Sequence, residues 1–118
     1  FTEFMEQRAP GHTTLDGEIY RCGMADFKAE ITESINSLDY LGDAEAFDKE
    51  QELKAMYISC EAIEIFAARH AGLAEKMAGT ESCPTRKREL EEIARVCRKV
   101  PARAPETFHE ALQMYWFV

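Results

Sequence analysis

Glu106 and His109 stand three residues apart as Glu-x-x-His, a spacing that could contribute ligands to a metal ion. A di-metal centre inside a helical bundle needs two such pairs and two further glutamates that face inward. The second pair is absent from this 118-residue sequence. We therefore expect no metal site in this stretch.

The four cysteines, Cys22, Cys60, Cys83 and Cys97, are widely separated and form no Cys-x-x-Cys pair. Zinc and iron–sulfur sites need clustered thiolates, so neither is predicted. Cys60 and Cys97 fall on apolar helical faces, which favours small core residues over reactive thiols. This usage is typical of reduced cysteines in a cytosolic protein. The sequence also lacks a Gly-x-Ser-x-Gly motif, a glycine-rich phosphate loop and a His-Glu-x-x-His motif.

The two remaining histidines have different surroundings. His70 lies between Ala67 and Ala74 on an apolar helical face, where a hydrogen-bonded core histidine is far more common than a ligand. His12 lies in the polar segment Gly11–Thr14, and such a loop can present an imidazole and hydroxyls to a substrate hydroxyl or carboxylate. The same segment can simply cap a helix. On residue types alone the structural role carries more weight, and both roles remain open.

The stretch from Ala44 to Ala78 is the longest helical pattern in the chain and must position its neighbours. It contains no proline and one glycine, Gly72, and its apolar residues keep helical spacing on two lines. The first line consists of Leu53, Met56, Cys60, Ile63, Ala67, Ala74 and Met77. The second line consists of Ile58, Ala62, Ile65, Phe66 and Leu73. A stripe this wide indicates neighbours on more than one side.

The length of this helix is itself informative. Unbroken, it would reach about 50 Å, whereas a compact domain of this size has a diameter near ~35 Å. Either the helix bends near Gly72, or the chain is a piece of a larger body whose other parts cover the overhang.

Shorter helical patterns flank the long helix, and no strand candidate is present. They cover Phe1–Arg8, Asp16–Leu38, Thr85–Lys99 and the residues from Glu106 to Val118. The short link between the second pattern and the long helix favours antiparallel packing. The sequence therefore predicts an all-α fold of about four to five helices packed antiparallel around one long helix.

Several residues are typical of helix boundaries. Asp43 is expected to cap the start of the long helix, and Gly79 its end in a left-handed conformation. Pro84 suits the first position of the next helix. The segment Val100–Pro105 is predicted to be extended, because each proline disfavours helix in the residue before it.

The charge balance limits the classes of partner. Lys and Arg total 14 against 22 Asp and Glu, for a net charge of −8, which argues against nucleic acid or an anionic membrane as the main partner. Half of the basic residues lie between Arg86 and Arg103, either as a solvated helix face or as a docking patch. No signal peptide or membrane-spanning run is present in the sequence, so a cytoplasmic location is expected.

The two ends of the chain have unusual composition. It begins with Phe1 rather than Met, and its last five residues, Met114–Val118, are its most apolar five. A free terminus is normally polar or frayed. We expect residues 1–118 to be a single helical segment from a longer polypeptide.

Four stretches of the sequence resemble a known family. They are FMEQRAPGHT, LDYLGDAEAFDKEQELKAMYISCEAI, FAARHAGLAEKMA and VPARAPETFHEALQMYWFV. Together they resemble the amino-terminal helical half of glycyl radical enzymes, in the branch of glycerol and diol dehydratases, choline trimethylamine-lyase and isethionate sulfite-lyase. The ordered set, rather than any single motif, carries the resemblance, which covers essentially the whole chain.

The resemblance implies a helical layer of a larger ten-stranded α/β barrel, active under anaerobic conditions. In that family a glycyl radical, installed by an iron–sulfur S-adenosylmethionine activase, acts through a cysteine, and the substrate radical expels water, an amine or sulfite. The Cys-x-Glu segment and the glycine loop are absent here, so no catalytic residue and no bound cofactor are expected in this stretch. The implied partners are the remainder of the polypeptide, the activase and a second copy in a homodimer. A bacterial microcompartment is left open as a location.

His12 is the one site residue that the resemblance supplies, because dehydratases of this branch place a substrate-contacting histidine in the matching loop. Histidine there favours hydroxyl substrates over the sulfite-lyase pattern. His109 stands where relatives often have tryptophan, a departure that alters packing. Two alternatives remain: a pyruvate formate-lyase-type formate acetyltransferase, and a stand-alone helical interaction module without catalysis.

Overall fold

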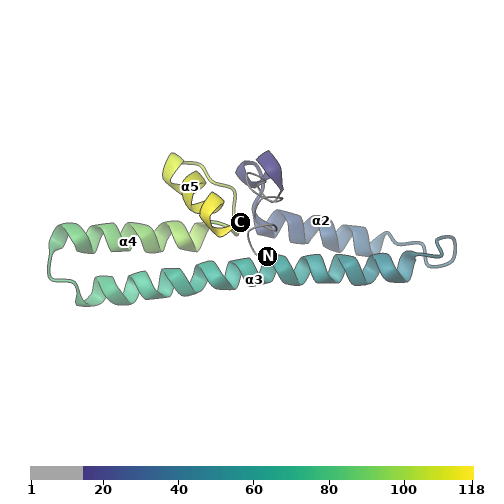
Figure 1. The fold of residues 1–118 in the computed structure, drawn as a ribbon, viewed down its shortest axis with the longest axis horizontal. Helices are drawn as coiled ribbons and strands as arrows, with labels where there is room; N and C mark the ends of the chain where they lie inside the picture. Colours follow the sequence, from purple (N-terminus) through teal and green to yellow (C-terminus); the bar gives the residue numbers. More distant parts are fainter. Residues whose placement is uncertain (1–14) are drawn as a thin grey trace, which may run out of the picture.

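The computed structural model describes residues 15–118, which form an elongated array of helices 63 Å along its longest axis (Figure 1). In order along the chain, the elements are η1 (Asp16–Tyr20), α2 (Met24–Asn36), α3 (Ala46–Thr80), α4 (Pro84–Lys99) and α5 (Phe108–Phe117). No strand occurs within these residues. The predicted all-α architecture around one long helix is confirmed.

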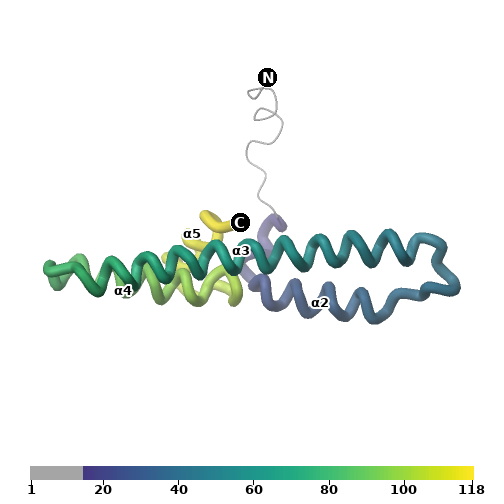
Figure 2. The backbone as a smooth tube through the Cα atoms, turned by 90° about the horizontal axis from the view of Figure 1, so that it is seen from below, coloured from purple at the N-terminus to yellow at the C-terminus, as the bar shows by residue number. Residues whose placement is uncertain are grey.

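Helix α3 is the longest element, and α2, α4 and α5 all contact it. Helix α2 runs antiparallel along its amino-terminal half, and α4 runs antiparallel along its carboxy-terminal half, so that α2 and α4 lie end to end on one side of α3 (Figures 1 and 2). An ion pair ties each hairpin: Lys28 to Glu64 at 2.6 Å between α2 and α3, and Arg98 to Glu75 at 2.9 Å between α3 and α4. Helix α5 and η1 lie over the middle of the array, where α2 and α4 meet (Figure 1).

The side of α3 that faces α4 is built from small residues. Its buried members are Ala67, Ala71, Ala74 and Ala78, which recur at three and four residue intervals. Small side chains at this spacing form a shallow groove and let two helix axes approach closely. Leu90, Ala94 and Cys97 of α4 are buried in return. The first predicted apolar line of the long helix is therefore the one that supplies the core, although Met56 and Met77 at its edges stay exposed.

The second apolar line of α3 is only partly covered within residues 15–118, where Phe66 contacts Trp116 and Phe117 of α5. Ile58, Ile65 and Leu73 are each more than half exposed, and Phe66 is 44% exposed. Within the described residues, α2 and α4 pack along one side of α3 and α5 reaches Phe66, while Ile58, Ile65 and Leu73 stay exposed.

The pattern predicted as one helix over Asp16–Leu38 is two elements, and a tertiary contact explains the break. The backbone N–H groups of Met24 and Ala25 donate to the carbonyls of Pro101 and Ala102, at 2.8 and 3.1 Å. The first N–H groups of any helix lack partners within the helix itself. Here a loop that follows α4 supplies them, so α2 starts at this contact and the preceding residues form the separate turn η1.

Three predicted boundaries differ from the structure. Asp43 is not the N-cap of α3, because Glu45 holds that position and the Asp43 carboxylate accepts the Glu45 N–H at 2.9 Å in the preceding turn. Gly79 is not a left-handed cap, because the helix continues through it to Thr80. Residues 100–102 form turns, with a cis Val100–Pro101 bond, although the Val100 backbone itself is extended as predicted. Pro84 is confirmed as the first residue of α4.

The predicted helix Phe1–Arg8 and the loop that carries His12 lie outside the described residues. Within residues 15–118, no helix combines the length and the apolar character needed to cross a membrane.

Candidate functional site

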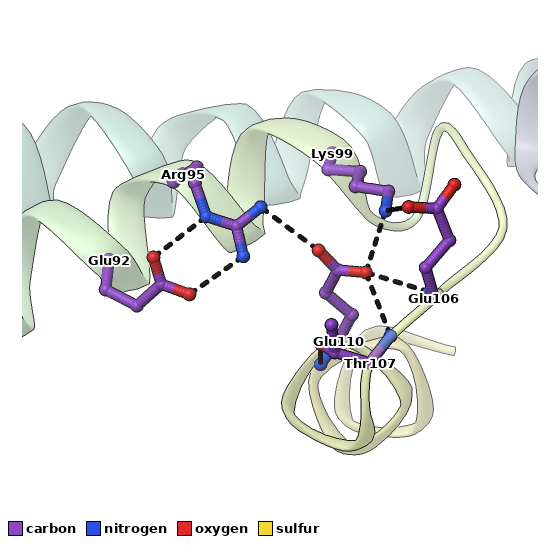
Figure 3. Close-up of polar contacts among 6 residues, drawn as sticks. All are labelled: Glu92, Arg95, Lys99, Glu106, Thr107 and Glu110. Atoms are coloured by element: carbon purple, nitrogen blue, oxygen red, sulfur yellow. Dashed lines mark hydrogen bonds and ion pairs between the residues drawn. The ribbon is translucent and has the colours of Figure 1, made fainter.

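Glu110 is the one charged residue that is fully buried among residues 15–118, with 1% of its surface exposed. It occupies the first turn of α5, where it forms a reciprocal cap with Thr107 (Figure 3). The Glu110 N–H donates to Thr107 Oγ1 at 3.2 Å, and the Thr107 N–H donates to Glu110 Oε2 at 3.3 Å. This Thr-x-x-Glu arrangement satisfies two N–H groups that the helix cannot satisfy itself.

The same carboxylate also receives donors from α4 and from the loop before α5. Glu110 Oε2 accepts from Lys99 Nζ and from the Glu106 N–H, both at 2.8 Å, and Oε1 accepts from Arg95 Nη1 at 3.1 Å. Lys99 also pairs with the Glu106 carboxylate at 2.8 Å, and Arg95 binds Glu92 with two nitrogens (Figure 3). We call Glu92, Arg95, Lys99, Glu106, Thr107 and Glu110 the Glu110 cluster.

Electrostatic interactions within the Glu110 cluster keep the Glu110 side chain ionised. The Lys99 ammonium, the Glu106 N–H and the Arg95 guanidinium together lower the pKa of Glu110 from 4.5 to about 2, against the opposing effect of burial. Glu110 is therefore a carboxylate at neutral pH and cannot serve as a general acid there. No buried side-chain oxygen or nitrogen within residues 15–118 lacks a partner. The arrangement holds three segments together rather than presenting a reactive group.

The loop between α4 and α5 connects the Glu110 cluster to the start of α2. Its two ends are held by the Glu110 cluster, and its Pro101 and Ala102 carbonyls accept the first N–H groups of α2. Gly23 lies against this loop so closely that a Cβ would collide with the Ala102 carbonyl oxygen. The negative end of the α4 dipole thus faces the positive end of α2, which is a favourable arrangement.

An apolar groove of about 340 Å³ lies between α3, α4 and α5. Its wall includes Leu73, Met77, Ile93 and Trp116. His70 lines it too, half-buried, with Nδ1 3.0 Å from the Phe66 carbonyl oxygen and its ring edge-on to Phe66. This hydrogen bond agrees with the predicted structural role of His70. The groove has few polar groups that converge on one point, so it has the chemistry of a packing surface.

The other predicted candidates do not come together. Glu106 binds Lys99, whereas His109 is exposed on α5, and no group of three or more metal-binding side chains occurs within the described part of the chain. Cys60 and Cys97 are buried in the core, as predicted, and burial raises the pKa of both thiols. His12 lies outside the described residues, so its assignment stays a prediction.

The sequence reasoning missed the Glu110 cluster. One signal for it was present: Thr107-Phe-His-Glu110 matches the Ser/Thr-x-x-Glu capping pattern directly before an apolar run. The donors from Lys99 and Arg95 had no local signal, because they depend on how α4 packs against α5.

A comparison with protein families gives a match over residues 1–118 to the family described as pyruvate formate lyase-like. The chain belongs to this family. Within it, the relatives place the chain in the branch of glycyl radical enzymes that contains dehydratases and isethionate sulfite-lyases. The predicted family resemblance is confirmed.

Two of the most similar family members, one of them also as a solved structure, show how far this likeness extends. Trans-4-hydroxy-L-proline dehydratase from Clostridioides difficile is 48% identical over 118 residues, which are 100% of this chain and 15% of that protein. Isethionate sulfite-lyase from Nitratidesulfovibrio vulgaris is 42% identical over 100 residues, 85% of this chain and 12% of that protein. The crystal structure of the C. difficile hydroxyproline dehydratase with its substrate bound matches 97% of this chain and 14% of its own, at 46% identity and a TM-score of 0.86.

The chain therefore spans only about 12 to 15% of the length of the family members it matches. Its helices correspond to a portion of a much larger structure.

Proposed function

We propose that residues 1–118 form a helical layer of a glycyl radical dehydratase or lyase, which cleaves a carbon–heteroatom bond of a small substrate under anaerobic conditions. The observation that carries this proposal is the match to the hydroxyproline dehydratase structure, because it combines 46% identity with a TM-score of 0.86 over 97% of the chain. The layer itself supplies no reacting group. Its part is to hold neighbouring segments in place.

The substrate we favour carries a hydroxyl leaving group, and trans-4-hydroxy-L-proline is the first compound to test. Identity to the hydroxyproline dehydratase is 48%, against 42% to an isethionate sulfite-lyase. A histidine at position 12 favours the same class, since an imidazole can donate a hydrogen bond to a departing hydroxyl. Isethionate is the second candidate, supported by the sulfite-lyase relative.

The remainder of the proposed enzyme supplies the chemistry. Membership of the family implies a glycyl radical, and we propose that an iron–sulfur S-adenosylmethionine activase installs it. Neither the radical glycine nor the catalytic Cys-x-Glu segment occurs in these 118 residues. A cytoplasmic location and a homodimer remain predictions. The dehydratase and sulfite-lyase relatives favour a lyase over a formate acetyltransferase.

The test begins with the intact mass of the native polypeptide and the sequence that follows Val118. The proposal expects a chain several-fold longer, with a Cys-x-Glu segment and a glycine loop. That protein, activated anaerobically, should show an organic radical by electron paramagnetic resonance and should turn over hydroxyproline or isethionate. A native chain that ends at Val118 would contradict catalysis and favour the helical interaction module.

A further inference from the structure

We propose that the exposed side of α3 binds a segment of the same polypeptide that follows residue 118, and that this segment carries apolar side chains beside acidic ones. The docking rests on the proposed function, in which residues 1–118 are one layer of a longer enzyme. We call the binding surface the α3 outer face. It consists of Ile58, Ala62, Ile65, Arg69, Leu73 and Lys76.

The α3 outer face is a single stripe along the helix. Its six members follow one another at intervals of three or four residues, so they share one side of α3, and all six are exposed. The buried alanines lie on the opposite side, because Ala67 is about 200° around the helix from Ile65, as is Ala71 from Arg69. Helices α2 and α4 both lie on one side of α3 and leave this stripe uncovered (Figures 1 and 2).

Two cations interrupt the apolar stripe. Arg69 and Lys76 make no ion pair with any residue between 15 and 118, whereas Lys54 pairs with Glu50 on the same helix at 2.7 Å. Their neighbours one turn away on α3 are Ile65, Phe66, Gly72, Leu73, Gly79 and Thr80. None of these neighbours is acidic, so α3 itself cannot neutralise either charge.

The mixture of apolar and cationic side chains determines the chemistry of the partner. Apolar side chains of a covering segment would remove Ile58, Ile65 and Leu73 from water, which is favourable. The same contact would remove Arg69 and Lys76 from water, and a cation buried without a carboxylate is costly. The segment that binds here must therefore place carboxylates beside its apolar residues.

The apolar groove between α3, α4 and α5 continues this surface on one side. Leu73 belongs both to the α3 outer face and to the wall of the groove. Trp116 of α5 lines the groove as well, and 60% of its surface is exposed. A segment that covers Leu73 therefore also reaches the groove, whose volume of about 340 Å³ can receive an apolar side chain.

A segment of the same polypeptide fits this surface better than a second copy of the chain. The chain covers only 15% and 12% of two family members it matches, so most of the proposed enzyme lies outside residues 1–118 and is tethered to them. Tethering raises the effective concentration of a docking segment. A two-fold contact between copies would instead bring Arg69 and Lys76 of one face against the same cations of the other, which repel.

Zero-length crosslinking of the full-length protein tests the proposal. A carbodiimide joins a lysine amine to a carboxylate in contact with it, and mass spectrometry of the digest identifies both residues. We expect a crosslink from Lys76, and from the new amine in an Arg69→Lys variant, to an Asp or Glu beyond residue 118. Lys54 is the control, because it should crosslink to Glu50 on its own helix. A mixture of isotope-labelled and unlabelled protein shows whether the two joined residues belong to one chain or to two.

Charge reversal then measures whether the contact stabilises the enzyme. Lys76→Glu should remove the crosslink and lower the midpoint of thermal unfolding of the full-length protein, because it brings like charges together. A second substitution, of the crosslinked carboxylate by lysine, should restore at least half of the lost midpoint, since the two residues act through one contact. Lys54→Glu is the matched control on α3, and the same second substitution should not restore its midpoint.

Crosslinks of Lys76 that join two copies, or that stay within residues 15–118, would overturn the proposal. Absence of any crosslink from Lys76 while Lys54 reacts would do the same, as would a Lys76→Glu midpoint that the second substitution leaves unchanged. The proposed function fails on a different result. A full-length protein that gives the expected crosslinks but turns over neither hydroxyproline nor isethionate would contradict the activity and leave the docking in place.

Discussion

Glu110 shows how one buried carboxylate can make stability depend on pH. Its pKa in the folded chain is about 2, below its ordinary value of 4.5, so it stabilises the fold above pH 4.5 and loses that contribution as the pH falls toward 2. We expect Glu110→Gln to lower the free energy of unfolding at neutral pH by on the order of 2 to 3 kcal/mol. The difference between wild type and variant should shrink as the pH falls.

Denaturant unfolding of residues 1–118 at pH 7, 5 and 3 checks this prediction. Other carboxylates with lowered pKa values, such as Glu75 and Asp43, also lose stability in acid, so the comparison must be with the variant and not with pH alone. A difference that stays constant over this range would show that the charge of Glu110 is not what stabilises the loop.

Gly23 is a second residue with a specific requirement. Gly23→Ala would place a Cβ against the backbone of Ala102, which cannot rotate away as a side chain would. We expect a loss of about 1 to 3 kcal/mol, typical of an overpacked site. Gly79→Ala is the control, because nothing lies near its Cβ and alanine favours a helix by roughly 0.5 to 1 kcal/mol. Thermal unfolding distinguishes the two: equal effects would argue against a close approach at Gly23.

Some of these single-residue roles could be predicted from the sequence, and others could not. Pro84 could be placed because its ring fits a first helical turn wherever the helix packs. Asp43 and Gly79 were misplaced because the residue types allow several boundary positions, and α3 in fact extends through Gly79 to Thr80. The role of Gly23 depends on a loop almost eighty residues away in the sequence, so no local pattern could reveal it.

At the scale of elements, the contact between α3 and α4 depends on small side chains. Ala71 is completely buried on the side of α3 that packs against α4 and α5, whereas Ala68 is exposed on the same helix. We expect Ala71→Leu to destabilise residues 1–118 by roughly 1 to 3 kcal/mol through overpacking. Ala68→Leu should change stability by less than about 0.5 kcal/mol.

Circular dichroism with denaturant measures both variants of this pair. If Ala71→Leu were tolerated as well as Ala68→Leu, the two helices would be further apart than the structure has them. The helical pattern predicted α3 itself, but the periodicity alone could not say which of its two apolar lines would face α4.

At the scale of the whole molecule, the exposed second line of α3 agrees with the small share of the family members that this chain covers. Ile58, Ile65 and Leu73 are exposed, and so is Trp116 at 60%. We expect residues 1–118, expressed alone, to bind a hydrophobic dye and to associate, whereas the full-length protein should bind far less dye per mole. Fluorescence titration of both proteins measures the difference.

Absence of dye binding by the isolated residues would favour the stand-alone module instead, because such a module must bury these side chains by itself. Substitution of Ile65 by lysine offers a control, since it should lower dye binding by the isolated chain without disturbing the buried line. The composition predicted this surplus of apolar surface, but only the structure shows that α2 and α4 both leave the same side of α3 open.

The arrangement of the helices along α3 also affects how the chain folds. Each half of α3 pairs with the helix next to it in sequence, through a short link, so most contacts in the array join residues close together along the chain. Contacts of this kind form faster than those between distant segments. The two hairpins can therefore form early in folding, before contacts between more distant segments are made.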